Sequence, residues 1–199
     1  GETRFDIEPP ERQVSAGKQL ADTVDGRPVF VFASVVEGEE ATYVAACEAF
    51  VKTTPRPLVI WVPRAPEVFD ATAALLVQSG LNVSRRSDVI GDTFELVSEI
   101  DKTDVLLGDS FGEMFFYLAA ADVVSVGGGF VEKGAHNVIE PLALGKPVIV
   151  GPHIWTIEFP GREAQDAGVL EICNDPGRLA DLLLKARGGS AAAATAFHK

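Results

Sequence analysis

Runs of hydrophobic residues alternate along the chain with segments in which hydrophobic residues recur at helical spacing. The run PLVIWVP at 57–63 is apolar almost throughout, as is typical of a strand buried on both faces of a parallel sheet. The segment at 38–53 instead has apolar residues at helical spacing, which predicts an amphipathic helix. The whole pattern predicts strands at 28–34, 57–63, 81–84, 104–108, 122–128, 146–151 and 169–172, and helices at 38–53, 66–79, 111–121, 137–145, 158–167 and 176–187.

Strands that alternate with helices predict an α/β fold, a Rossmann-like parallel sheet with helices on both faces. Residues 1–27 are polar, and we expect a linker that leads into one short helix. Residues 28–187 are expected to form the domain itself, and 188–199 a low-complexity tail. Sheets of this kind bind ligands at the carboxyl ends of their strands, so the loops after the predicted strands are the place to look for chemistry.

Composition and charge narrow the classes of function. The chain has 199 residues, of which 47% are hydrophobic, as in an ordinary globular domain. A net charge of -12 argues against nucleic-acid binding and against contact of this domain with an anionic membrane. No apolar run approaches the roughly 18 residues of a membrane span, and no signal-peptide pattern opens the chain.

The cysteines and histidines give no metal-binding pattern. Cys47 and Cys173 lie far apart in segments expected to be buried, which predicts free thiols, as in a reducing compartment. The three histidines are scattered. We therefore expect neither a metal ion nor a cofactor.

The first motif is ASVVEGEE, which follows the first predicted strand. Ser34 ends that strand and Glu37 lies in the turn. Gly38 is expected to open a helix whose first turn holds Glu39 and Glu40. An acidic helix start is explained by capping alone, but its backbone N–H groups can also bind a phosphate or a sugar hydroxyl. Both interpretations stay open.

The second motif, VPRAPE, places Arg64 between two prolines at the end of a strand. A pre-organised guanidinium suits bidentate binding of a phosphate or carboxylate. The alternative is a surface salt bridge with Glu67. The position of the loop at a strand end favours the ligand.

The third motif, GDSFGEM, starts at Gly108 and follows another predicted strand. Its structural interpretation is a helix start, with Asp109 or Ser110 as the cap and Glu113 as the capping-box partner. A nucleobase could also stack or hydrogen-bond against this loop, which includes the flexible Gly112. The sequence leaves both open.

The fourth motif, VGGGFVEKGAHNVIEP, contains three consecutive glycines. These glycines, Gly127, Gly128 and Gly129, let the backbone turn sharply and approach a ligand closely. His136 and Asn137 lead into a predicted helix whose N-terminus can hold a phosphate. Glu140 lies inside that helix and can accept hydrogen bonds from a ribose diol, although a solvated helix face is the alternative. The G-x-G-x-x-G fingerprint is absent.

These four motifs and a fifth, GKPVIVGPH, resemble in order the C-terminal domain of 3-deoxy-D-manno-octulosonic acid (Kdo) transferases, which are GT-B glycosyltransferases. The opening GETRFD also resembles the start of that domain. The resemblance covers residues 1 to about 185. It implies that this chain is the C-terminal half of a GT-B enzyme.

The family transfers Kdo from CMP-Kdo to a lipid A precursor, with inversion, at the cytoplasmic face of the bacterial inner membrane. The resemblance implies that Arg64 contacts the phosphate or cytidine, that 108–113 lines the nucleotide pocket, that Asn137 meets the phosphate and that Glu140 meets the ribose hydroxyls. The catalytic base and the acceptor site would belong to an N-terminal domain absent from this chain. We therefore expect nucleotide binding without turnover.

Three departures from the family pattern keep alternatives open, and one of them is Gly134-Ala135-His136 where the family has Gly-Gly-His. The Thr-His of the first family motif is Val35-Val36 here, and the His of the Pro-Arg-His-Pro motif is Ala65. Loss of a hydrogen-bonding partner costs about 1–3 kcal/mol. The alternatives are a noncatalytic nucleotide-binding relative and a UDP-sugar-dependent GT-B enzyme or epimerase.

Overall fold

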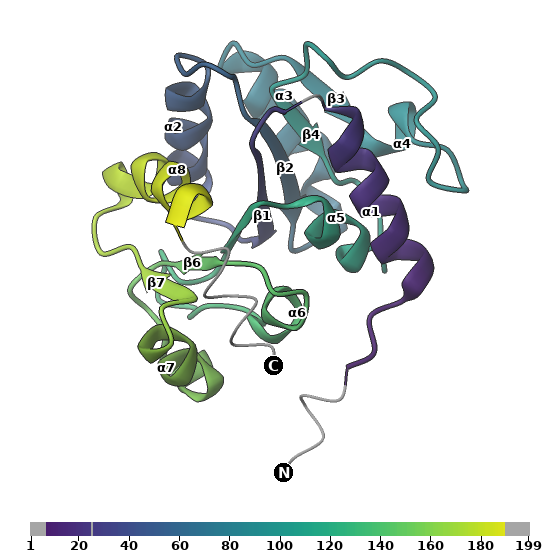
Figure 1. Ribbon diagram of the computed structural model, residues 1–199. Helices are drawn as coiled ribbons and strands as arrows, with labels where there is room; N and C mark the ends of the chain where they lie inside the picture. Colours follow the sequence, from purple (N-terminus) through teal and green to yellow (C-terminus); the bar gives the residue numbers. More distant parts are fainter. Residues whose placement is uncertain (1–6, 25, 190–199) are drawn as a thin grey trace.

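The computed structural model describes residues 7–24 and 26–189, which form one parallel sheet covered by helices on both faces (Figure 1). Within these residues the sheet has seven strands in the order β3-β4-β2-β1-β5-β6-β7. The predicted α/β fold is confirmed. The strands are β1 (Val29–Val35), β2 (Leu58–Pro63), β3 (Val83–Arg85), β4 (Val105–Leu107), β5 (Val123–Val126), β6 (Val148–Val150) and β7 (Leu170–Ile172).

Helices connect successive strands, as parallel pairing requires. None of those described is long and apolar enough to cross a membrane. They are α1 (Glu11–Thr23), α2 (Glu40–Phe50), α3 (Phe69–Gln78), α4 (Arg86–Val89), α5 (Met114–Ala120), α6 (Ile139–Ala143), α7 (Glu158–Asp166) and α8 (Leu179–Gly189), with single 3₁₀ turns at Pro66–Val68, Trp155–Ile157 and Pro176–Arg178.

The central strand β1 supplies side chains to both halves of the core, because successive side chains of a strand point to opposite faces. Val29 and Val31 pack in the cluster that includes α1 and α5. Phe30 and Phe32 pack in the other cluster, beneath α2 and α8. Figure 1 shows these two helix pairs on opposite sides of the sheet. β1 is therefore buried on both faces, as its apolar sequence predicts.

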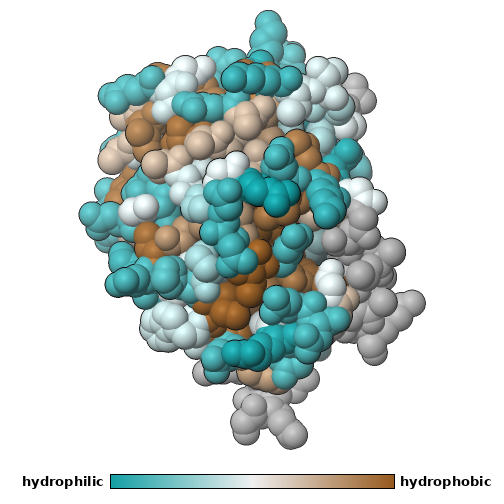
Figure 2. Space-filling view, turned by 90° about the vertical axis from the view of Figure 1, so that its left-hand side faces the viewer, coloured by the Kyte–Doolittle hydropathy of each residue, from teal (hydrophilic) through white to brown (hydrophobic). Residues whose placement is uncertain are grey.

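The α2 helix shows how one face of a helix is buried and the other solvated. Tyr43, Cys47 and Phe50 are buried, whereas Glu48 is exposed. Viewed from the side that carries α2 and α8, hydrophilic side chains alternate with patches of hydrophobic side chains (Figure 2). Cys47 and Cys173 are both buried free thiols, which confirms that prediction.

The α1 helix, expected within a linker, covers part of the core. Leu20 and Val24 are buried, and α1 packs directly on α5. A Cβ on Gly17 would lie 2.3 Å from the carbonyl oxygen of Phe116, so the two helices touch backbone to backbone at this point.

Five helices begin two or three residues later than predicted, α2, α3, α5, α6 and α8, and for two of them the structure shows the reason. The helix expected at 111–121 begins at Met114, because Gly112 has a φ of +68° that a helix does not accommodate. The helix expected at 137–145 begins two residues late, since the side chain of Asn137 accepts a hydrogen bond from the first helical amide instead of joining the helix. The short helix α4 was not predicted.

Candidate functional site

The loops that carry the sequence motifs meet at the edge of the sheet formed by the carboxyl ends of the strands. β1 lies between β2 and β5. The strands β2, β4 and β3 extend the sheet on one side of β1, and β5, β6 and β7 extend it on the other. Such a point leaves a crevice in which α/β sheets bind ligands. The loops at 36–39, 64–65, 108–113 and 127–138 follow β1, β2, β4 and β5, so all four motifs contribute to this edge.

Ser34 is displaced from the ladder of β1. The register with β2 shifts between Ala33 and Val35, which leaves Ser34 as the extra residue of a bulge. Its φ of +59° is uncommon for a residue with a side chain. Backbone hydrogen bonds hold both sides of the bulge, from Gly127 N–H to the Ala33 carbonyl at 2.7 Å and from Arg64 N–H to the Val35 carbonyl at 2.8 Å.

The second and third motifs enclose a cavity of about 140 Å³. The guanidinium of Arg64 has no ion-pair partner within the described part of the chain, and no salt bridge to Glu67 is present there. The exposed Phe111, with 71% of its surface accessible, stands beside it. The predicted site residues that line this cavity are Ser34, Arg64, Ser110, Gly112 and Glu113.

The carboxylates of the third motif anchor the loop rather than cap a helix. Asp109 accepts hydrogen bonds from Ser87 N–H at 2.9 Å and from the Ser87 hydroxyl at 2.6 Å. Glu113 accepts two from the Arg86 guanidinium, at 2.9 and 3.0 Å. Neither side chain caps α5, so the predicted capping box is wrong. The partners lie on α4, which the sequence analysis missed.

The three glycines of the fourth motif allow backbone segments to approach closely. A Cβ on Gly127 would lie 2.3 Å from the Ser34 carbonyl oxygen, and one on Gly129 would lie 2.8 Å from the Gly151 amide nitrogen. Gly128 has a φ of +93°, which favours glycine. The loop is thus wedged between the ends of β1 and β6.

Glu39 is the residue of this region that sequence analysis misjudged. It lies before α2 instead of inside its first turn, and its side chain is fully buried. Its carboxylate accepts hydrogen bonds from the backbone N–H groups of Gly128, Phe130 and Val36. Desolvation raises the pKa of this carboxyl group, while the three N–H donors oppose the shift. Its partner Gly128 lies 89 residues away along the sequence, and no local sequence pattern marks such a contact.

The imidazole of His136 lies half-buried against the glycine loop. Its backbone N–H donates to the Gly127 carbonyl at 2.9 Å. Burial lowers the pKa of the imidazole, and the nearby cations Arg64 and Lys133 lower it further. Its Nε2 atom is buried and has no hydrogen-bond partner in the described part of the molecule. A neutral imidazole with a free ring nitrogen suits a polar ligand group.

Asn137 and Glu140 follow at the start of α6. The Asn137 Oδ1 atom accepts a hydrogen bond from Ile139 N–H at 2.8 Å, which leaves its amide NH₂ group for other partners. Burial raises the pKa of Glu140. His136 and Asn137 line a cavity of about 540 Å³ together with Lys133.

The structure thus groups some predicted site residues and separates others. Ser34, Arg64, Ser110, Gly112 and Glu113 line the smaller cavity, whereas His136 and Asn137 line the other. The predicted residues Glu37, Gly38, Gly108, Asp109, Gly128 and Glu140 line neither of them.

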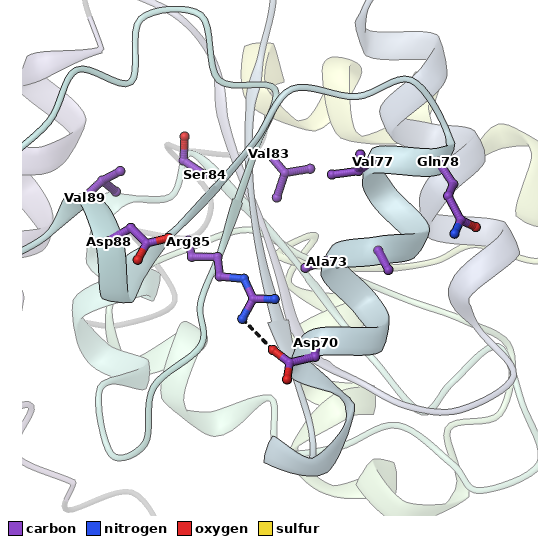
Figure 3. A pocket seen from close by; sticks show the side chains of 10 residues that line it. Asp70, Ala73, Val77, Gln78, Val83, Ser84, Arg85, Asp88 and Val89 are labelled. Carbon is purple, nitrogen blue, oxygen red and sulfur yellow. Dashed lines mark hydrogen bonds and ion pairs between the residues drawn. The ribbon is translucent and has the colours of Figure 1, made fainter.

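A larger cavity, about 630 Å³, lies away from the motifs, between α3 and the edge strand β3 (Figure 3). The ion pair of Arg85 and Asp70, at 2.6 Å, crosses one part of it. No predicted site residue lines this cavity. Within the described residues no group of three or more His, Cys, Asp or Glu side chains could hold a metal ion.

Known proteins are similar to this chain in sequence and in structure, although no family model matches it. It is 44% identical over 171 residues to the 3-deoxy-D-manno-octulosonic acid transferase of Bordetella pertussis, across 84% of this chain and 38% of that protein. It also resembles the solved C-terminal CMP-Kdo binding domain of WaaA from Acinetobacter baumannii, with a TM-score of 0.80 and 27% identity over 93% of this chain and 97% of that one. The chain belongs to the Kdo transferase family.

The chain spans only 38% of the Bordetella relative and corresponds to the C-terminal domain of the family. A glycosyltransferase from Rickettsia africae shares the fold, with a TM-score of 0.60 and 13% identity over 98% of this chain and 48% of that protein. The expected C-terminal half of a GT-B architecture is therefore confirmed.

The two departures that replace a family histidine lie in different surroundings. Val36 is buried, with 7% of its surface accessible, and its backbone N–H donates to Glu39. Ala65 is half-buried in the loop that presents Arg64. The apolar Val36 packs into the protein interior, so the change from the family's His does not leave an unpaired polar group there.

Proposed function

We propose that this chain is the donor-binding domain of a Kdo transferase, which holds CMP-Kdo while Kdo passes to a lipid A precursor. The observation that carries the proposal is the structural similarity to a CMP-Kdo binding domain over 93% of the chain. The convergence of four motif loops at one edge of the sheet supports it. The acceptor site and the catalytic base belong to a domain outside this chain, and the full-length protein acts at the cytoplasmic face of the bacterial inner membrane.

An anionic donor requires positive charge and N–H donors, and this edge supplies them within an acidic chain. The Arg64 guanidinium forms paired hydrogen bonds with the phosphate. The Asn137 amide and the half-buried His136 imidazole contribute further contacts to the donor. Glu140 accepts hydrogen bonds from the ribose hydroxyls. These residues bind and orient the donor, so the isolated chain binds nucleotide and does not turn over.

The test is calorimetric titration of the chain with CMP, UMP and UDP, beside Arg64→Ala and Glu140→Ala. The matched controls are Arg178→Ala and Glu48→Ala, which change exposed residues away from the site. We expect CMP to bind best and each site variant to weaken it by about tenfold or more, since hydrogen bonds to charged groups contribute about 1.5–3 kcal/mol. Preferred binding of UDP would contradict the donor assignment, and unchanged affinity in both variants would contradict the placement of the site.

A further inference from the structure

We propose that Glu39 is a positioning residue of the donor site, whose carboxylate fixes the glycine-rich loop (residues 127–134) against the end of β1. This inference rests on the proposed function. Glu39 has no accessible surface, so it does not touch a donor bound at the surface of this edge. It acts through the backbone of the loop.

The carboxylate joins two loops that are distant in sequence. Its Oε1 atom accepts from Gly128 N–H at 2.8 Å and from Phe130 N–H at 3.1 Å. Its Oε2 atom accepts from Val36 N–H at 3.2 Å. No arginine or lysine is paired with it in the described part of the chain. Backbone dipoles alone compensate the charge, so removal of the acceptor leaves three donors unpaired, two of them in the glycine-rich loop.

Gly128 connects this anchor to the residues that face the donor. A Cβ built on Gly128 would lie 3.0 Å from the Cδ2 atom of His136 and 2.2 Å from the Gly134 carbonyl oxygen, so the imidazole and the end of the loop both pack on Gly128. His136 N–H in turn donates to the Gly127 carbonyl. A Gly128 backbone that is free to move therefore frees the imidazole and the segment that leads to Asn137.

Tyr43, in the first turn of α2, contacts the same region as Glu39 and further restricts its motion. The Tyr43 hydroxyl lies 3.0 Å from the Ser125 hydroxyl of β5, and both are buried. The Tyr43 ring meets the Phe130 ring edge to face, with 5.7 Å between centroids. Glu39 and Tyr43, four residues apart, present one face of the chain to β5 and its loop.

Glutamate is the side chain that this geometry selects. Glutamine offers one carbonyl oxygen, and its NH₂ group faces an N–H donor, so it retains only part of the acceptor set. Alanine retains none. We therefore expect the loop to be held most strongly in the wild type, less strongly in Glu39→Gln and least strongly in Glu39→Ala. The matched control is Glu48→Gln, on the exposed face of α2.

The experiment measures three properties of each variant: amide hydrogen exchange by NMR, CMP affinity by calorimetry, and thermal unfolding. In Glu39→Gln we expect the amides of Gly128 and Phe130 to exchange at least about tenfold faster while that of Val124 in β5 is unchanged, and CMP to bind about tenfold more weakly. Glu48→Gln should match wild type in all three. Because Glu39→Ala can fail to fold, Glu39→Gln decides the result.

Other outcomes overturn the inference. Unchanged exchange at Gly128 and Phe130 shows that Glu39 does not fix the loop. Faster exchange with unchanged CMP affinity shows that donor binding does not depend on the contact between Glu39 and the loop. Exchange that accelerates equally at Val124 indicates general destabilisation of the protein. A wild-type chain that binds no CMP contradicts the proposed function instead, and the exchange data still decide whether Glu39 fixes the loop.

Discussion

Removal of the Arg86 guanidinium tests whether the third motif is a loop anchored on α4. The side chains of Arg86 and Glu113 are only 10% and 17% exposed, and two hydrogen bonds join them. Arg86 also donates to the carbonyls of Ile90 at 2.5 Å and Gly91 at 3.3 Å. Arg86→Met keeps the length of the stem and removes all of these donors.

The expected cost is large because the partner stays behind. Removal of one member of a buried ion pair costs about 3–5 kcal/mol, since the other charge is left uncompensated. With a urea m-value of about 2 kcal/mol/M, the unfolding midpoint of Arg86→Met should fall by about 2 M. Glu113→Gln should also destabilise, but the double variant should cost less than the sum of the two, because no uncompensated charge remains.

Urea denaturation followed by circular dichroism measures these differences. The matched control is Arg162→Met, which removes the exposed i,i+4 pair with Glu158, whose side chains are 67% and 62% exposed. Such a pair contributes about 0.3–0.5 kcal/mol, so the control should barely move the midpoint. A loss below about 1 kcal/mol in Arg86→Met, or strict additivity with Glu113→Gln, would refute the anchoring argument.

Three further predictions concern the same edge of the sheet. Gly127→Ala should lower the free energy of unfolding by about 1–3 kcal/mol, measured in urea, because its Cβ would overlap the Ser34 carbonyl oxygen at 2.3 Å. The pKa of Glu140 is raised by burial, so the stability that its neutral form contributes is complete below the unfolded-state pKa and is lost as pH rises through the folded-state pKa. Glu140→Gln should therefore unfold at higher urea than wild type at about pH 7 and not at about pH 4, while it loses CMP affinity; equal midpoints at both pH values contradict this. Phe111→Ala should change the free energy of unfolding by less than about 0.5 kcal/mol, because the ring is 71% exposed. Calorimetry should show that it weakens CMP binding about tenfold, as expected of a ring that stacks on the nucleobase beside Arg64.

The sequence predicts the sheet well and the loops poorly, for a physical reason. The strands at 28–34 and 57–63 are recognised because burial on both faces demands an apolar run, which is visible locally. The start of α5 is missed because Asp109 and Glu113 have the residue types of a capping box, and only the three-dimensional structure shows that Ser87 and Arg86 bind them instead. A hydrogen-bond partner that is distant in sequence leaves no periodic signal.

The same limit explains why the candidate site is predicted in part. The edge of the sheet follows from topology alone, and so does the grouping of Ser34 with Arg64 in one cavity. The role of Glu39 does not follow, because a glutamate after a glycine at a helix start is explained by the helix itself. Its burial and its bonds to Gly128 and Phe130 exist only once β1 and β5 are paired.

Three carboxylates at this edge of the sheet have hydrogen-bond partners within the protein, whereas the arginine that faces the proposed donor has no ion-pair partner in the described residues. CMP-Kdo is anionic, so an unpaired carboxylate near its phosphate would repel it. The structure satisfies Glu39 with backbone N–H groups, Asp109 with Ser87 and Glu113 with Arg86, whereas Arg64 stays without an ion-pair partner in the described residues. Glu39, Asp109 and Glu113 thus hold the loops in place, and the Arg64 guanidinium remains available to the proposed donor in a chain of net charge -12.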